Sequence, residues 1–238
     1  MKRILLMVLR NFFFLPYMWI RLFYYASHVD KYTDEEHYAM IKWIIIRANK
    51  GGNVRIDVHG EENLPKSNGY ILFPNHQGMF DVLAVIEASP QPFSVTPKKE
   101  VKNIPFLKQV FACLRAYMID RDDVRQAMKV IGKITEEVIN GRNYIIFPEG
   151  TRSKNGNVMG EFKGGSFKAA TRAKCPIIPV ALIDSFKPFD TKTITPVTVQ
   201  VHFLEPLLYE NYKDLKTTEI AKIVQERIQV VLDREVVV

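Results

Sequence analysis

The segment YILFPNHQGMFD, residues 70–81, combines three structural signals over a short distance. It opens on the apolar run Tyr70–Phe73, which predicts a buried strand. Polar residues then surround His76, and a helix is predicted over Phe80–Ala88. His76 and Asp81 therefore fall on a strand-to-helix connection, where the active sites of α/β domains tend to lie.

Short apolar runs alternate with helical stretches on both sides of this segment. Further strands are predicted at residues 54–60, 93–96, 116–119, 144–147, 177–183 and 198–203. Further helices are predicted at residues 105–114, 124–140, 165–173 and 217–235. Strands separated by helices indicate an α/β domain, with a layered, mixed and largely parallel sheet flanked by helices. The strand that begins at Val54 alternates polar and apolar residues, which predicts antiparallel pairing at a sheet edge.

The first 50 residues are predicted to associate with a membrane, ahead of an α/β domain over residues 51–238. Residues 1–26 are rich in aliphatic and aromatic side chains, but Arg10, Pro16 and Arg21 interrupt them. No apolar run reaches the ~18 residues that a transmembrane helix requires, and no small-residue cleavage site indicates a signal peptide. At helical spacing Arg3, Arg10 and Arg21 share one stripe, which is typical of a helix lying in the membrane interface.

A second N-terminal helix is predicted over residues 33–51. Thr33 and Glu36 have the spacing of a capping box, and glycines at 51 and 52 provide a stop signal. Pro16 should kink or restart the first helix. The alternative to a membrane-interface pair is that both helices pack on the core of the domain.

The composition fits a globular protein with an anionic partner. The chain has 238 residues, of which 47% are hydrophobic and 25% charged, which suits one α/β domain with a small appendage. Lysine and arginine outnumber acids by 33 to 26, so nucleic acid, anionic lipid and phosphorylated substrates are all compatible. A basic protein without a special partner is compatible too. Cys113 and Cys175 do not form a metal or disulfide pattern and are predicted to be buried.

His76 and Asp81 together can form a general base whose ring is oriented by a carboxylate. Their segment contains no serine or cysteine, so the base is predicted to act on the hydroxyl of a bound molecule. The helix near Phe80 could direct backbone N–H groups toward developing negative charge. The alternative is a loop histidine beside an aspartate that caps the helix.

A second polar segment, FPEGTRS at residues 147–153, follows the predicted strand at 144–147. Gly150 allows a close approach of backbone to ligand, and Arg152 offers a planar fork suited to phosphate. Glu149 could accept a hydrogen bond from a substrate hydroxyl or hold Arg152. The alternative is an ordinary turn with a local ion pair.

Two further cations are candidates for binding an anion. Arg121 ends the segment IDR at residues 119–121, again at a predicted strand end, although a local ion pair would explain it equally well. Lys163 lies shortly after the segment with Arg152 and is the best placed of the lysines to contact a phosphate.

These segments, in this order, resemble the glycerophospholipid acyltransferase family. The resemblance covers roughly residues 54–205, extends to the N-terminal helices, and rests on NHxxxxD, IDR, FPEGTRS and the proline-bearing strand from residue 175. It implies that His76 is the base and Asp81 its orienting partner. It also implies a site for the glycerol phosphate group, formed by Glu149, Gly150, Thr151, Arg152 and the nearby Arg121. Many members carry serine at position 78, whereas this chain has Gly78. The backbone N–H groups near Gly78 to Phe80 are candidates for the oxyanion site, with Gly78 first among them.

The resemblance implies transfer of a fatty acyl group from acyl-CoA or acyl carrier protein to the sn-2 hydroxyl of 1-acylglycerol 3-phosphate, giving phosphatidic acid. The enzyme would act on membrane lipids at the cytoplasmic face of the cell membrane. A thioester is already activated and no cluster has metal-ligand spacing, so neither a cofactor nor a metal is expected. The alternatives are a membrane-surface protein that binds lysolipids and a hydrolase that uses the same base on water. Nucleic-acid binding is disfavoured because no aromatic-plus-basic strand motif is present.

Overall fold

The computed structural model of the chain describes residues 2–120 and 123–236. Its strands are β1 Val54–His59, β2 Ile71–Pro74, β3 Ser94–Val95, β4 Tyr144–Ile145, β5 Ile177–Ile183 and β6 Val197–Phe203. Its α-helices are α1 Lys2–Arg10, α2 Leu15–Ser27, α3 Asp34–Gly51, α4 Asp81–Ala88, α5 Leu107–Cys113, α6 Val124–Ile139, α7 Lys168–Ala173, α8 Lys187–Asp190, α9 Tyr209–Tyr212 and α10 Thr217–Glu235.

The strands form one mixed sheet in the order β1-β6-β5-β2-β4-β3. The four strands β5, β2, β4 and β3 run parallel to one another, whereas β6 runs antiparallel to β5. The predicted fold class, a largely parallel mixed sheet flanked by helices, is confirmed. Strand β1 lies at an edge as predicted, but its predicted antiparallel pairing is wrong: β1 pairs parallel with β6, because β6 has already reversed direction.

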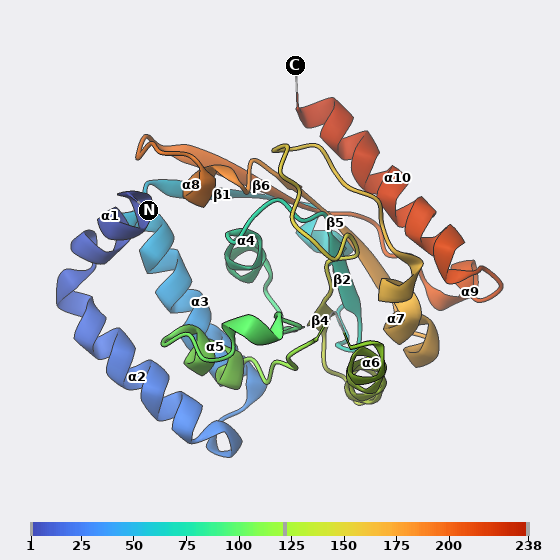
Figure 1. Cartoon of the computed structure of the whole chain (residues 1–238), viewed down its shortest axis with the longest axis horizontal. Coiled ribbons are helices and arrows are strands. Elements are labelled where there is room, and N and C mark those ends of the chain that lie inside the picture. Colours follow the sequence, from blue (N-terminus) through green and yellow to red (C-terminus); the bar gives the residue numbers. More distant parts are fainter. Residues whose placement is uncertain (1, 121–122, 237–238) are drawn as a thin grey trace.

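Strand β2 lies at the centre of the sheet and is buried on both faces. Leu72 belongs to the apolar cluster on the side of α3 and α4, while Ile71 and Phe73 belong to the cluster beneath α6, α7 and α10. Figure 1 shows these helices on the two sides of the sheet. Each such side chain stabilises the fold by about 1.5–3 kcal/mol through burial, so the end of β2 is a rigid support for the connection that carries His76.

Most other predicted elements are present with shifted ends. The prediction for β5 matches its observed bounds, and the predicted helix at 165–173 begins with a 3-10 turn at Gly164–Phe167. The predicted strand at 116–119 is wrong. There Ile119 forms only an isolated bridge to Lys98, since Arg115 has a φ of 47° and turns the chain just before this run.

The N-terminal helices begin and end as their sequence signals indicate. The capping box of α3 is formed, with the Glu36 N–H donating to Thr33 Oγ1 at 3.2 Å and the Thr33 N–H donating to Glu36 Oε2 at 2.8 Å. Helix α2 restarts with Pro16 in its first turn, where a missing N–H costs no helix bond. The chain bends by 66° between Lys2–Arg10 and Phe12–Ser27.

The predicted single stripe of arginines is wrong, because this bend separates α1 from α2. Arg3 is 2% exposed and donates to four backbone carbonyls, including those of Gly52 at 2.6 Å and Thr195 at 2.9 Å. Arg10 stays exposed but donates to Asn53 Oδ1 at 2.5 Å. These two arginines therefore attach α1 to the turn after α3 instead of reaching toward lipid phosphates.

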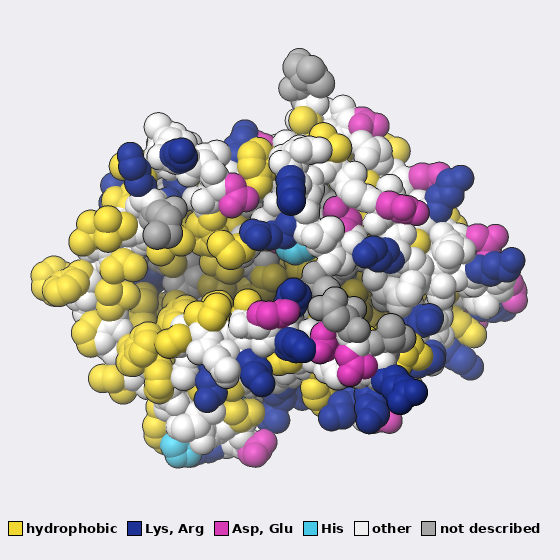
Figure 2. Space-filling model, viewed as in Figure 1, with side chains coloured by type: hydrophobic (Ala, Val, Ile, Leu, Met, Phe, Trp, Pro, Cys, Tyr) yellow, Lys and Arg dark blue, Asp and Glu magenta, His cyan; other side chains and the backbone are white. Residues whose placement is uncertain are grey.

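Helices α1 and α2 nevertheless leave a broad apolar surface uncovered. Leu9 is 60% exposed, Phe13 90% and Ile20 67%. Figure 2 shows hydrophobic side chains over this end of the molecule, continuing into a hollow at its centre where a histidine lies beside Lys and Arg side chains. In the described part of the chain no helix by itself is long and apolar enough to span a membrane, although the bent pair α1–α2 meets that test jointly.

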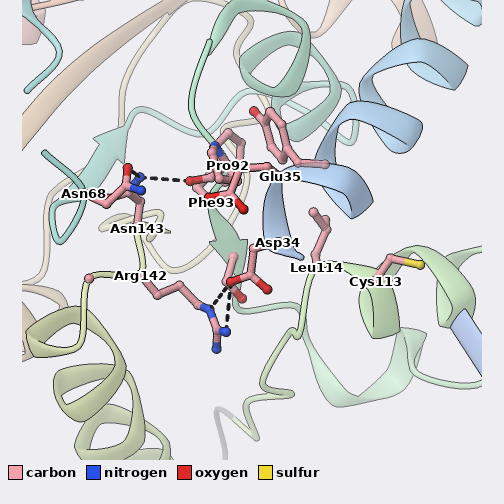
Figure 3. Close-up of a pocket in the computed structure, with 12 residues that line it drawn as sticks. Asp34, Glu35, Asn68, Pro92, Phe93, Cys113, Leu114, Arg142 and Asn143 are labelled. Carbon is pink, nitrogen blue, oxygen red and sulfur yellow. Dashed lines mark hydrogen bonds and ion pairs between the residues drawn. The ribbon is translucent and has the colours of Figure 1, made fainter. Parts of the chain in front are cut away.

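Helix α3 is tied to the rest of the fold by charged groups. Asp34 accepts from Arg115 Nε at 3.0 Å and from Arg142 Nη2 at 2.9 Å, and Figure 3 shows Arg142 reaching Asp34 at the wall of a cavity of about 50 Å³. Buried residues of α2 and α3, such as Leu22 and Ile41, belong to the same cluster as Leu72 of β2. The division into units 1–50 and 51–238 stays a prediction.

Candidate active site

His76 and Asp81 form a hydrogen-bonded pair between β2 and α4. The ring Nδ1 of His76 lies 2.7 Å from Asp81 Oδ2. The Asp81 side chain is 0% exposed and that of His76 is 15% exposed. Because Nδ1 faces a carboxylate, it carries the proton, and Nε2 is the nitrogen with a free lone pair. Within residues 2–120 and 123–236, Nε2 has no hydrogen-bond partner.

Asp81 also accepts two backbone hydrogen bonds from the connection that carries the histidine. The N–H of Gln77 donates to Oδ2 at 2.7 Å, and the N–H of Gly78 lies 3.0 Å from the same oxygen. The loop is thus wrapped around the first residue of α4, and the carboxylate orients both the ring and its backbone. The prediction that the Gly78 N–H serves an oxyanion site is contradicted, because that N–H is bonded to Asp81.

The absence of a side chain at Gly78 has a packing reason. A Cβ placed there would lie 3.3 Å from the Cα of Phe186, tighter than an ordinary van der Waals contact, and 3.4 Å from Asp190 Oδ2. The turn that leads into α8 therefore packs directly over the loop of the histidine. The departure from the serine of many family members allows this close approach.

Glu149 supports His76 from the neighbouring strand. Strands β2 and β4 are parallel neighbours, so the segments that leave their carboxyl ends emerge side by side. Glu149 is 4% exposed, and its Oε1 accepts the N–H of His76 at 2.7 Å while its Oε2 accepts the N–H of Gly160 at 2.9 Å. Burial raises the pKa of the Glu149 carboxyl, and these two N–H groups oppose the rise.

These contacts correct two expectations for Glu149. It does not hold Arg152, and it does not present its carboxylate to an open site. Each of its oxygens instead fixes a backbone N–H, so its contacts are those of a positioning residue for His76. The sequence offered no signal for this, because both partners are backbone groups of distant residues.

The segment around Arg152 holds His76 on its other side as well. The Ser153 N–H donates to the His76 carbonyl oxygen at 2.7 Å. The ring of Phe147 lies 4.2 Å from the imidazole, measured between centroids. The histidine is therefore fixed at its N–H, its carbonyl, its Nδ1 and one face of its ring, which leaves Nε2 as its reactive edge.

An open pocket of about 420 Å³ lies beside this loop. Its walls include Gln77, Thr151, Arg152, Phe186 and Asp190. Thr151 and Arg152 are exposed, so the pocket presents a hydroxyl and a guanidinium next to the residue after His76. The structure thus brings Thr151 and Arg152 together at one pocket, and their role in binding a phosphate stays a prediction.

Lys163 and Gly150 lie together at the same end of the sheet. Gly150 has a φ of 70°, and a Cβ there would be 3.3 Å from Lys163 Nζ, so glycine permits both the turn and the approach of the ammonium group. Arg121, the remaining predicted phosphate ligand, lies outside the described residues.

Buried amides also support the site, and the sequence analysis did not single them out. Gln77 donates to the Leu182 carbonyl at 2.7 Å and accepts from the Ser185 N–H at 2.8 Å, while Asn75 exchanges two hydrogen bonds with the Leu182 backbone. Residues 75 and 77 flank His76 and face opposite to it, as alternate residues in extended chain do. The placement of two amide residues at alternate positions on either side of His76 was the sequence signal that could have identified them.

Neither cysteine is suited to nucleophilic catalysis. Cys113 and Cys175 are 2% and 4% exposed, as predicted, and burial raises the pKa of both thiols to about 12. A thiol with such a pKa carries little thiolate at neutral pH. An oriented base beside an open pocket with hydroxyl and guanidinium groups is therefore the chemistry that these residues offer.

Comparison with protein families identifies the family of this chain. The model of the family described as "Acyltransferase" matches residues 55–183, which include His76, Asp81 and Arg152. The chain belongs to the acyltransferase family. This confirms the resemblance inferred from the sequence motifs.

Several curated relatives of this acyltransferase share one name. The 1-acyl-sn-glycerol-3-phosphate acyltransferase of Saccharomyces cerevisiae is 34% identical over 72% of this chain and 58% of its own length. The protein of the same name from Borreliella burgdorferi is 32% identical over 65% of this chain and 62% of its own length. The chain thus spans about 60% of the length of the curated relatives it matches.

A solved structure shares the fold. The 1-acyl-sn-glycerophosphate (LPA) acyltransferase PlsC of Thermotoga maritima matches with a TM-score of 0.77 and 22% sequence identity. The match covers 98% of this chain and 96% of that one. The likeness includes the N-terminal helices as well as the sheet.

Proposed function

We propose that this acyltransferase moves a fatty acyl group from a thioester to the sn-2 hydroxyl of 1-acylglycerol 3-phosphate, giving phosphatidic acid. The observation that carries the proposal is the His76 ring, held by Asp81 at 2.7 Å while Nε2 has no hydrogen-bond partner among the described residues. Such a base needs a hydroxyl to act on, and the enzyme's own thiols are buried. The name shared by the curated relatives supports this acceptor.

In the proposed reaction His76 Nε2 takes the proton of the acceptor hydroxyl as its oxygen attacks the thioester carbonyl carbon. Asp81 holds the ring and stabilises the imidazolium. The carbon–sulfur bond then breaks, and the leaving thiolate receives the proton back from His76. The N–H groups of Met79 and Phe80, which have no acceptor in the described part of the chain, are candidates to stabilise the oxyanion.

Recognition of the acceptor would rest on the pocket beside this base. Arg152 can hold a phosphate through two parallel hydrogen bonds, with Thr151 as a hydroxyl partner and Lys163 as a nearby ammonium group. Arg121 completes the proposed set. Fixing the phosphate would position the hydroxyl against Nε2, and such positioning contributes as much to rate as the base itself. The reaction as proposed requires no metal or other cofactor.

The proposal predicts the products of a defined mixture. Purified protein, incubated with 1-acylglycerol 3-phosphate and either acyl-CoA or acyl carrier protein bearing an acyl chain, should yield phosphatidic acid by mass spectrometry. A matched mixture without the acceptor should release little free fatty acid. Thioester consumption that yields fatty acid regardless of acceptor would identify a hydrolase and overturn the proposal.

We also propose that α1 and α2 hold the enzyme on the membrane, at its cytoplasmic face, as an interfacial rather than a spanning element. The support is their exposed apolar surface, which large side chains such as Phe13 provide. Exposed apolar patches of this kind mark contact with a partner or a membrane, and the proposed acceptor is itself a membrane lipid.

Replacing Leu9, Phe13 and Ile20 together with serine is expected to lower binding to liposomes at least ~10-fold, because three large apolar side chains leave the interface. The melting temperature should change little, since these side chains are exposed. The matched control replaces Ile139 and Val230, which are 63% and 67% exposed on other helices. Wild-type sedimentation of the triple variant with liposomes would contradict the proposal.

A further inference from the structure

Helices α6 and α7 carry a cluster of surface cations away from the reacting groups. Lys129 and Lys133 are four residues apart on α6, and Lys168 and Arg172 are four residues apart on α7, so each pair lies on one helix face. The two helices pack against each other. We call these four residues the α6–α7 basic surface; Figure 2 shows Lys and Arg side chains gathered over these helices.

Cations predominate along most of these two helices, although Asp123 caps α6 and Glu136 and Glu137 lie near its C-terminal end. Residues 162–183 contain Lys163, Lys168, Arg172 and Lys174 but no aspartate or glutamate, and residues 124–135 likewise contain only cations among their charged residues. Along residues 2–120 and 123–236, no ion pair involves any member of the α6–α7 basic surface. Unpaired like charges repel each other and destabilise the fold, so an anionic partner is the reason we infer for this arrangement.

The position of this surface narrows the partner. Helices α6 and α7 pack on the other face of the sheet from α1 and α2 (Figure 1), which bear the apolar surface. An anionic lipid surface in contact with α1 and α2 would therefore be remote from most of these cations. Lys163, which lies against Gly150, continues the positive charge toward the active site.

We propose that the α6–α7 basic surface docks the acyl donor in the form of an acidic acyl carrier protein. This rests on the proposed function, which requires a thioester to reach His76. The charges lie on the outer faces of two helices, about 6 Å apart along each axis at four-residue spacing. Dispersed charges of this kind steer association between proteins, whereas a nucleotide thioester with a compact headgroup is bound in a concave site.

Charge reversal on α6 tests the proposal without touching the active site. Replacing Lys129 and Lys133 with glutamate should raise the KM for a bacterial acyl carrier protein bearing an acyl chain by about 10-fold at low salt. The KM for acyl-CoA should stay within about twofold. The matched control reverses the exposed Lys66 and Lys222, which lie elsewhere in the fold, and should change neither value.

The outcomes separate the docking proposal from the proposed function. Binding of the unacylated carrier protein, followed by fluorescence anisotropy, needs no turnover and should weaken by the same factor in the α6 variant. An unchanged carrier affinity, or an equal rise in KM for both donors, would overturn docking. Loss of liposome binding in that variant would assign the surface to anionic lipid instead. If carrier binding weakens in the α6 variant but no acyl transfer is found even with the wild-type protein, the proposed function is rejected and the proposed docking site stands.

Discussion

Replacing His76 with alanine should lower kcat for acyl transfer by about 10²–10⁴-fold, the usual contribution of a positioned general base. The KM for the acceptor should change little, because the imidazole acts on the hydroxyl proton and the phosphate is held elsewhere. Steady-state kinetics with 1-acylglycerol 3-phosphate and a thioester donor measure both quantities. Circular dichroism and a melting curve establish that the variant remains folded.

A second histidine–carboxylate pair in the same chain provides the control. His59 Nε2 lies 3.3 Å from Asp57 Oδ2, but both side chains are exposed, at 47% and 42%, on the edge strand β1. Replacing His59 with alanine removes a similar pair and should leave kcat unchanged. Near-wild-type turnover by folded His76→Ala would show that this histidine is not the base.

The contrast between these two pairs explains why the spacing of a histidine and an aspartate in the sequence does not by itself identify a general base. The sequence placed His76 and Asp81 on a strand-to-helix connection because the apolar run before them had to be a buried strand, and that reasoning depends on local pattern. Two conditions suit the His76–Asp81 pair to act as a base. Asp81 is completely buried, and it accepts hydrogen bonds from two further backbone N–H groups. Both result from how the loop folds around the first turn of α4.

Predictions failed where long-range contacts decide the outcome. Helical periodicity put Arg3 and Arg10 on a membrane-facing stripe, but the periodic argument assumes a straight helix. The chain bends by 66° after α1, and Arg3 then finds backbone carbonyls near residues 52 and 195, far away in sequence. Burying this guanidinium is tolerated because those carbonyls accept hydrogen bonds from both of its terminal nitrogens, although its buried Nε has no partner in the described part of the chain.

The role of Glu149 escaped sequence reasoning for the same reason. A carboxylate beside Arg152 at a strand end suggests a surface ion pair or a substrate contact. The parallel pairing of β2 and β4 instead brings Glu149 to the His76 N–H, while residues 150–160 fold back to supply the Gly160 N–H. Only the arrangement of strands in the sheet determines this contact.

Glu149→Gln should consequently lower kcat by about 10- to 100-fold, with the acceptor KM nearly unchanged. A glutamine has one acceptor oxygen and one NH2 group, so either the His76 N–H or the Gly160 N–H must face a donor. A buried unsatisfied donor costs about 1–3 kcal/mol, and the loop that holds the imidazole would shift to relieve it. The matched variant is Arg152→Ala, which should raise the acceptor KM more than it lowers kcat, because its exposed guanidinium lines the pocket.

The pH dependence of stability gives an independent readout of the same carboxylate. Burial raises the pKa of Glu149 in the folded protein, so folding opposes its deprotonation. Its contribution to the free energy of unfolding is therefore fully present below the unfolded pKa and is lost as pH rises through the folded pKa. Glutamine does not titrate, so the difference in unfolding free energy between wild type and Glu149→Gln should narrow as pH rises through that window. Denaturant unfolding at a series of pH values measures this difference in unfolding free energy. A difference that widens as pH rises would mean that the two N–H groups outweigh burial and hold the carboxylate in its charged form.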